Sequence, residues 1–206
     1  MPDSTPGWSD RPSAWLQAQA AAGRFTLLRQ AVLSCADGAL LHHEVFLRLE
    51  DPERPGEAIP AAECVPMAES VGLAPQIDRA VVEATVMAMD LDMYPARVAV
   101  NLSPLSLEDD GLRDWMYDYL QKHREAAARL IIEFPEYGIA VRQDRLVQWI
   151  DRFQQLGVEF SLDHFGKGFS SFAYLRAIKA HYLKIDGSFI RNLDQHEDNQ
   201  FFIKSV

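Results

Sequence analysis

The sequence predicts an α/β fold in which strands of a parallel sheet alternate with helices. From Arg97 onward, short aliphatic runs alternate with helical patterns, which is typical of consecutive βαβ units. Acidic side chains and a lysine close several of the predicted strands, where such folds gather their chemistry. The 206 residues, 48% of them hydrophobic, are enough for one domain with a substantial core. A closed barrel and a doubly wound sheet both fit this pattern. No glycine-rich dinucleotide turn follows the early strands, so a Rossmann sheet fits poorly.

The beginning of the chain is expected to hold a lead-in and a hairpin. Residues 1–24 form the lead-in, with a short Ala-rich helix over Ser13–Ala22. Two strands, Phe25–Leu33 and Leu40–Leu49, flank Asp37-Gly38, a dipeptide typical of hairpin turns. The hairpin is therefore expected to be the first part of the folded domain.

The remaining elements follow a polar, Pro-rich loop over Glu50–Glu57. The predicted helices are Pro60–Ser70, Pro75–Met89, Leu112–Arg124, Arg142–Leu156 and Ser170–Ile178, with the start of another over Leu193–Val206. The predicted strands are Arg97–Leu102, Leu130–Phe134, Val158–Asp163 and Tyr182–Ile185. On the helix over Arg142–Leu156, three apolar side chains share one face and are expected in the core: Trp149, Phe153 and Leu156.

Charge and composition exclude several classes of protein. The net charge of -10 argues against binding of nucleic-acid polymers, which requires a basic surface, but does not exclude a small anionic ligand. No apolar run approaches the roughly 18 residues of a membrane span, and the N-terminus lacks signal-peptide features. A cytoplasmic location is expected. Cys35 and Cys64 have no metal-binding spacing and are expected to be buried thiols in a reducing compartment.

Four oxygen-bearing side chains lie at or near the ends of predicted strands: Glu44, Asn101, Glu133 and Asp163. Taken singly, each has a structural interpretation, since Asn101 lies beside a helix N-cap region and Glu44 could be a surface strand residue. Their common placement indicates convergence at one edge of the sheet. Hard oxygen ligands of this kind suit Mg²⁺ or Mn²⁺.

Several motifs resemble, in order, those of the EAL family, whose members are cyclic di-GMP phosphodiesterases. They are Glu44-Val45-Phe46-Leu47-Arg48, Val100-Asn101-Leu102-Ser103, Glu133-Phe134-Pro135-Glu136, Asp163-His164-Phe165-Gly166 and Leu183-Lys184-Ile185-Asp186. The first motif has Val and Phe for the family's Ala and Leu, and Pro135 stands where the family has Thr. The resemblance runs from about Phe25 to the end of the chain. It implies a TIM-like (β/α)8 barrel of EAL type over residues 25–206.

The resemblance also implies that the barrel is incomplete at its C-terminus. A barrel of this kind typically takes about 250 residues. A further glutamate motif and a Gln-Gly segment of the family have no counterpart before Val206. Either the chain is a fragment or a partner supplies the missing wall, and we expect a fragment whose last strands lie beyond this end.

The same resemblance implies roles for eight side chains. The metal ligands would be Glu44, Asn101, Glu133 and Asp163. Arg48 would contact a phosphate of the nucleotide, and Asp186 would also bind the nucleotide. Lys184 would polarise the attacking water or a phosphate oxygen, and Glu136 would brace the loop after Asp163. The implied chemistry is two-metal hydrolysis, in which cations about 4 Å apart share and activate one water. The metal would be Mg²⁺ or Mn²⁺, if any is bound.

His164 is the main departure, because the family has a second aspartate there as a ligand of the second metal. Imidazole binds Mn²⁺ or Zn²⁺ but is a poor Mg²⁺ ligand, and it lacks the charge of a carboxylate. We therefore expect a decayed site in which His164 only forms hydrogen bonds. In the loop that follows, Lys167 and Phe169 replace a small polar residue and a tyrosine.

Two segments, Phe46–Leu49 and Tyr182–Arg191, resemble the degenerate EAL modules of LapD-type receptors. These receptors are inner-membrane proteins that bind cyclic di-GMP without cleaving it. The leading hypothesis is a cyclic di-GMP-binding signalling module with little or no hydrolysis. The alternatives are an active phosphodiesterase and a scaffold that ignores nucleotide. Implied partners are cyclic di-GMP, a second copy in a homodimer, and other domains of a longer membrane receptor.

Overall fold

The structure is a computed structural model that describes residues 18–19, 22–51, 56–139, 141–167, 175 and 177–206. Most of the predicted lead-in helix and most of the predicted helix over Ser170–Ile178 lie outside these residues. Within them, no helix is long and apolar enough to cross a membrane.

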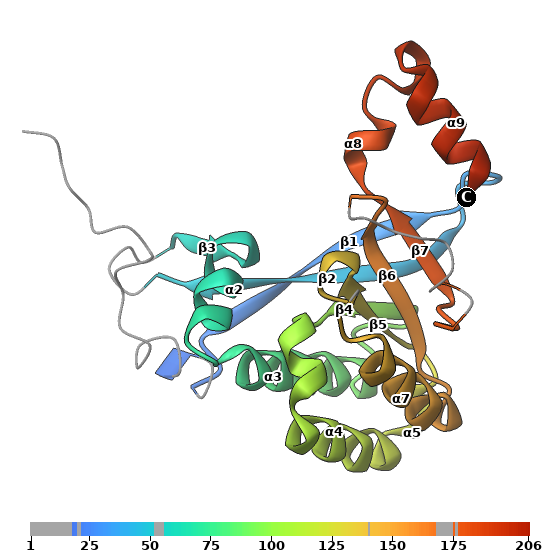
Figure 1. Cartoon of the computed structure of the whole chain (residues 1–206). Helices are drawn as coiled ribbons and strands as arrows, with labels where there is room; N and C mark the ends of the chain where they lie inside the picture. Colours follow the sequence, from blue (N-terminus) through green and yellow to red (C-terminus); the bar gives the residue numbers. More distant parts are fainter. Residues whose placement is uncertain (1–17, 20–21, 52–55, 140, 168–174, 176) are drawn as a thin grey trace, which may run out of the picture.

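The described strands form one mixed sheet of seven strands (Figure 1). Their bounds are β1 Phe25–Leu33, β2 Leu40–Glu50, β3 Ala58–Pro60, β4 Arg97–Asn101, β5 Leu130–Pro135, β6 Glu159–Phe165 and β7 Tyr182–Ile185. The order along the sheet is β1-β2-β4-β5-β6-β7. Neighbours from β2 to β7 pair in parallel, whereas β1 and the short β3 pair antiparallel with β2. The carboxyl ends of five parallel strands therefore lie along one edge.

Helices connect the parallel strands from β2 to β6, and two further helices follow β7. They are α2 Ala61–Ser70, α3 Ala74–Asp90, α4 Asp110–Lys122, α5 Arg124–Ala127, α6 Glu136–Ile139, α7 Gln143–Phe153, α8 Gly187–Ile190 and α9 Glu197–Ser205, with 3-10 turns at η2 Pro104–Glu108, η3 Gln154–Leu156 and η5 Leu193–Gln195. Figure 1 shows α3, α4, α5 and α7 gathered on one side of the sheet, while α8 and α9 stand apart from it.

The core lies between the sheet and the helices from α2 to α7. Residues of β5 are buried on both faces, as expected for a central parallel strand. Trp149 and Phe153 of α7 are fully buried, with Phe134 and Phe160 against them in edge-to-face contact. The predicted apolar face of this helix is therefore confirmed, including Leu156 at its end.

Most long elements agree with the prediction, and the differences concern short ones. The elements β3, η2, α6 and α8 have three to five residues each, too few to show a periodic pattern. The burial predicted for the thiols holds for Cys64 only. The prediction for Cys35 is wrong, because this residue lies in the exposed turn between β1 and β2.

Candidate functional site

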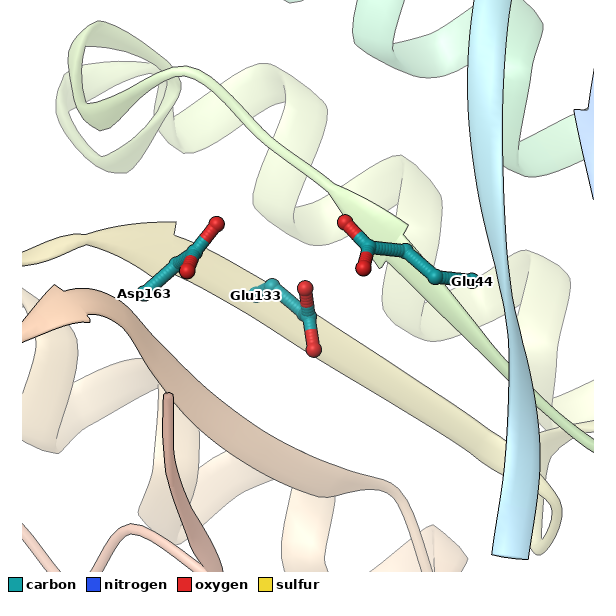
Figure 2. A group of neighbouring side chains, drawn as sticks. All are labelled: Glu44, Glu133 and Asp163. Carbon is teal, nitrogen blue, oxygen red and sulfur yellow. The ribbon is translucent and has the colours of Figure 1, made fainter. Parts of the chain in front are cut away.

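Five side chains meet at the carboxyl edge of the sheet, one from each parallel strand. Glu44 comes from β2, Asn101 ends β4, and Glu133 and Asp163 come from β5 and β6. Lys184 on β7 completes the group. Figure 2 shows the carboxyl groups of Glu44, Glu133 and Asp163 turned toward a shared space.

The lysine lies among the three carboxylates. Its Nζ donates to Glu44 Oε2 at 2.8 Å and to Glu133 Oε2 at 2.6 Å, and lies 3.4 Å from Asp163 Oδ2. Asn101 Nδ2 donates to Glu44 Oε1 at 2.8 Å. One oxygen from each carboxylate lies within 4.8 Å of the others. The structure therefore brings together all four residues expected as metal ligands, together with Lys184.

The acidic cluster, which we define as Glu44, Glu133 and Asp163, surrounds the buried Glu133 with like charges. Burial raises the pKa of Glu133 to about 7, and the neighbouring carboxylates add to the shift although Lys184 opposes it. Burial would lower the pKa of Lys184, but the contacts with Glu133, Glu44 and Asp163 raise it above its usual range. One ammonium thus faces three carboxylates, so the cluster carries excess negative charge.

These residues fit a divalent cation. Their oxygen donors come from separate strands, are held on rigid backbone and carry more negative charge than Lys184 neutralises. Glu44, Glu133 and Asp163 would hold such an ion with Asn101 beside them, and the ion would supply activation of a bound water.

His164 lies beside this cluster and has an unusual backbone conformation. Its φ is 55°, in the left-handed region, and its own N–H donates to Asp163 Oδ1 at 2.8 Å. The ring Nδ1 lies 2.9 Å from Asp186 Oδ2, while Nε2 lies 3.8 Å from Asp163 Oδ2. The imidazole therefore sits between two carboxylates.

Asp186 acts locally as the N-cap of α8. Its Oδ1 accepts from Ser188 N at 2.9 Å. Hydrogen bonds from Ser188 and then from His164 hold the pKa of this carboxyl well below its usual range. The expected nucleotide contact of Asp186 stays a prediction.

Glu136 and Arg48 have different positions relative to the cluster. Glu136 is buried at the start of α6, and its Oε2 accepts from Gly166 N at 2.9 Å, which ties the loop after β6 to α6. Arg48 lies four residues after Glu44 on β2, and its Nη1 donates to the Leu47 carbonyl at 2.8 Å. It is not among the residues that line the neighbouring cavity, so its phosphate contact also stays a prediction.

A cavity of about 510 Å³ opens beside the cluster. It reaches Glu44, Asn101, Asp163, His164 and Lys184. Its apolar wall includes Phe46, Val65, Ile77, Val81, Leu102 and Tyr137. Most of these come from α2, α3 and strand ends, where their spacing in the sequence is indistinguishable from that of core residues. The sequence alone therefore does not reveal this wall.

A set of hydrogen-bonded polar side chains on the cavity wall was also not predicted from the sequence. Asp78 on α3 accepts from Ser103 N at 2.8 Å and from Ser106 Oγ at 2.5 Å. Ser103 Oγ donates to Glu69 Oε1 at 2.7 Å and also caps η2 by accepting from Leu105 N. These bonds fix the segment that directly follows Asn101. The sequence signal was the Ser103-Pro104 pair, which indicates a helix start.

Comparison with known proteins identifies relatives over most of the chain. The family model described as EAL domain matches residues 13–206. The cyclic di-GMP phosphodiesterase PdeF of Escherichia coli (strain K12) is 33% identical over 169 residues, which are 81% of this chain and 22% of that protein. The bifunctional diguanylate cyclase/cyclic di-GMP phosphodiesterase MucR of Pseudomonas aeruginosa is 30% identical over 174 residues, 82% of this chain and 25% of that protein. The chain thus spans about a quarter or less of these relatives.

Solved structures of EAL domains have a fold similar to that of this chain. The FimX EAL domain of Pseudomonas aeruginosa bound to c-di-GMP has a TM-score of 0.82 at 31% identity and covers 93% of this chain and 77% of that chain. The S helix-GGDEF-EAL portion of Vibrio cholerae LapD bound to c-di-GMP has a TM-score of 0.85 at 23% identity, covering 93% of this chain and 46% of that chain. These likenesses confirm the predicted TIM-like α/β barrel fold.

Proposed function

We propose that this chain, which belongs to the EAL domain family, binds cyclic di-GMP. In Mg²⁺ it hydrolyses this nucleotide slowly or not at all. The observation that carries this proposal is the cavity of about 510 Å³ that joins an apolar wall to the acidic cluster and Lys184. Pockets for small ligands typically combine such a wall with a few convergent polar groups. The FimX domain at 31% identity holds c-di-GMP, which supports the same ligand here.

The chemistry of the cavity suits the two parts of this nucleotide. Flat guanine rings pack on apolar and aromatic side chains such as Phe46 and Tyr137. The phosphodiester groups carry negative charge and require cations, because the chain itself has a net charge of -10. Lys184 supplies one cation at the cluster, and a divalent ion held by the carboxylates would supply another.

The slow hydrolysis follows from His164. Cleavage by the two-metal route requires both cations to hold the same water. With an imidazole in place of a carboxylate, a second Mg²⁺ has no oxygen ligand from this residue. The nucleotide would therefore remain bound long enough for occupancy to be the signal.

Active hydrolysis of cyclic di-GMP is the second candidate. It is favoured by the convergence of five side chains, each within hydrogen-bonding or ion-pair distance of at least one other: Glu44, Asn101, Glu133, Asp163 and Lys184. Several relatives carry the name cyclic di-GMP phosphodiesterase, including PdeF. This candidate differs from the first only in the rate of cleavage.

Calorimetric titration with cyclic di-GMP, in Ca²⁺ and again in EDTA, tests binding. We expect low-micromolar or tighter affinity in Ca²⁺ and a loss of about tenfold or more for Phe46→Ala, which removes part of the cavity wall. Leu28→Ala on β1 is the matched control, because Leu28 is exposed and lies outside the cavity. No detectable heat from the folded protein would contradict the proposal.

Chromatography of the nucleotide after incubation in Mg²⁺ separates the two candidates. The expected result is intact cyclic di-GMP over hours at stoichiometric protein. Rapid appearance of the linear dinucleotide would overturn the receptor function and leave the phosphodiesterase.

Assembly and location belong to the same proposal. We expect a homodimer, to be checked by light scattering, and function as the cytoplasmic part of a longer inner-membrane receptor. Co-fractionation of the full-length protein with membranes would support the second expectation, and its recovery free of membranes would contradict it.

A further inference from the structure

We propose that His164 is a metal ligand rather than a residue of a decayed site, and that its Nε2 and Asp163 form a nitrogen–oxygen site selective for Mn²⁺ or Zn²⁺ over Mg²⁺. The inference rests on the proposed use of the acidic cluster as a metal centre. It does not require that nucleotide binds.

The position of Asp186 determines which ring nitrogen is free. Its Oδ2 lies 2.9 Å from His164 Nδ1. An ionised carboxylate only accepts hydrogen bonds, so Nδ1 carries the hydrogen in the neutral ring. Nε2 is then left with its lone pair exposed. A carboxylate that holds one nitrogen of a histidine while the other binds metal is a common arrangement in metalloproteins.

The free nitrogen lies beside the acidic cluster. Nε2 is 3.8 Å from Asp163 Oδ2. Zn²⁺ lies about 2.0 to 2.2 Å from nitrogen and oxygen ligands, so two ligands of one tetrahedral ion are about 3.4 Å apart. The two atoms would therefore have to approach by a few tenths of an ångström to bind one ion, which a small rotation of the half-exposed imidazole can supply. Asp163 is the residue that links this position to Glu44 and Glu133.

The backbone holds both ligands in place. His164 N donates to Asp163 Oδ1, which leaves Oδ2 directed toward the imidazole and Lys184. His164 O accepts from Lys167 N at 3.3 Å, closing a tight turn at the end of β6. The imidazole side chain is 51% exposed, so an ion can reach it from solvent.

The donor atoms determine the selectivity. Mg²⁺ prefers an octahedral shell of oxygens, whereas imidazole nitrogen favours Zn²⁺ and other transition-metal ions. A protonated imidazole that pairs with Asp163 and Asp186 is the competing arrangement, and it would bind no metal through nitrogen.

Pulsed electron paramagnetic resonance of the Mn²⁺-loaded protein distinguishes the two arrangements. Coupling to a histidine nitrogen is expected in the parent chain, absent in His164→Asp and retained in His196→Ala. His196 is a suitable control because it is exposed and lies at the start of α9. Mn²⁺ bound without nitrogen coupling, coupling that survives His164→Asp, or no Mn²⁺ binding would each overturn the proposal.

Calorimetry with Zn²⁺, Mn²⁺ and Mg²⁺ provides a second readout. His164→Asp should weaken Zn²⁺ binding by tenfold or more and strengthen Mg²⁺ binding. Asp186→Asn should weaken Zn²⁺ binding by about tenfold while keeping nitrogen coupling, because Asp186 is a positioning residue. An unchanged preference in His164→Asp would contradict the inference. Nucleotide titration is independent: nitrogen coupling without cyclic di-GMP binding would refute only the proposed function.

Discussion

At the scale of single residues, the arrangement around Lys184 explains how the acidic cluster folds. Three carboxylates within 4.8 Å of one another repel, and two of them are buried. The ammonium group of Lys184 contacts all three and offsets part of that repulsion. The same geometry means that a divalent ion and the lysine stabilise the cluster in the same way.

Lys184→Met tests this equivalence. The variant keeps most of the apolar stem but removes the charge, so we expect its free energy of unfolding in EDTA to fall by about 2 to 3 kcal/mol, because the buried carboxylates lose their partner. Thermal or urea unfolding measures the change. Added Mn²⁺ should recover most of the loss. Lys204→Met on the exposed face of α9 is the control, and equal losses in both variants would refute the argument.

How far the sequence predicts the site also depends on particular residues. Strand ends converge in any parallel sheet, so the meeting of Glu44, Asn101, Glu133 and Asp163 follows from the strand pattern. The position of His164 does not, because the sequence does not show that φ is 55° or that Asp186, 22 residues later, reaches its ring.

At the scale of elements, the site depends on close contact between α6 and the segment after β4. Gly138 on α6 lies against Pro104, and a Cβ added at Gly138 would lie 2.1 Å from Pro104 Cβ and 2.3 Å from Pro104 Cγ. No side chain fits there unless the two elements separate. Pro104 follows Asn101 closely, and Glu136 lies two residues before Gly138, so separation would disturb both sides of the site.

Gly138→Ala should therefore destabilise the protein by about 2 to 3 kcal/mol through overpacking and weaken cyclic di-GMP binding. Denaturant unfolding and calorimetry measure the two effects. Gly187→Ala on α8 is the matched control, since nothing lies within 4 Å of its added Cβ. If Gly138→Ala is as stable as Gly187→Ala, the contact with Pro104 is not tight in solution.

The hydrogen bond from Ser106 of η2 to Asp78 of α3 leads to a second prediction, on how the stability of the protein depends on pH. Burial raises the pKa of Asp78 from 3.8 to about 7, against the hydrogen bonds from Ser106 and Ser103. Between these values the folded protein holds a proton that the unfolded chain releases. The contribution of Asp78 to stability is therefore present below about pH 4 and is lost as the pH rises through about 7.

Asp78→Asn should remove the loss of stability that Asp78 causes as the pH rises, because the amide does not ionise. Between pH 5 and 8 we expect the parent to lose on the order of 2 kcal/mol more than the variant, measured by urea unfolding. Glu133 titrates in the same direction in both proteins, so their difference isolates Asp78. Parallel pH profiles would show that Asp78 remains ionised when folded.

The elements themselves were predictable in proportion to their length. The 17-residue α3 and the 11-residue α7 carry several turns of apolar periodicity and were found. The four-residue α6 was not, although it carries Glu136 and Gly138, because a single turn has no period to detect. Elements of this length are stabilised by tertiary contacts, here with Pro104 and Gly166, that the local sequence does not contain.

At the scale of the whole molecule, burial is unequal between the two ends of the sheet. Strands β4, β5 and β6 lie at its centre, with helices packed on them and most side chains fully buried. Helices α8 and α9 bury no residue, and Phe202 of α9 stacks on Phe189 of α8, with ring centroids 4.2 Å apart. Phe202 also stacks on Phe165 at the end of β6, with ring centroids 6.1 Å apart, which connects α9 to the sheet.

This inequality predicts the order in which backbone amides exchange with solvent. Local opening requires little free energy where few apolar contacts are broken, so amides of α9 should exchange on the order of a hundredfold faster than those of β5, after correction for intrinsic rates. Hydrogen exchange with mass spectrometry measures both in one experiment. Phe202→Ala should accelerate exchange in α8 and α9 while leaving β5 unchanged, because it removes the stack on Phe189 and Phe165. Phe201→Ala is the control, since Phe201 is 75% exposed. Equal protection of α9 and β5 in the parent chain would show that a further contact, such as a second copy of the chain, covers α9 in solution.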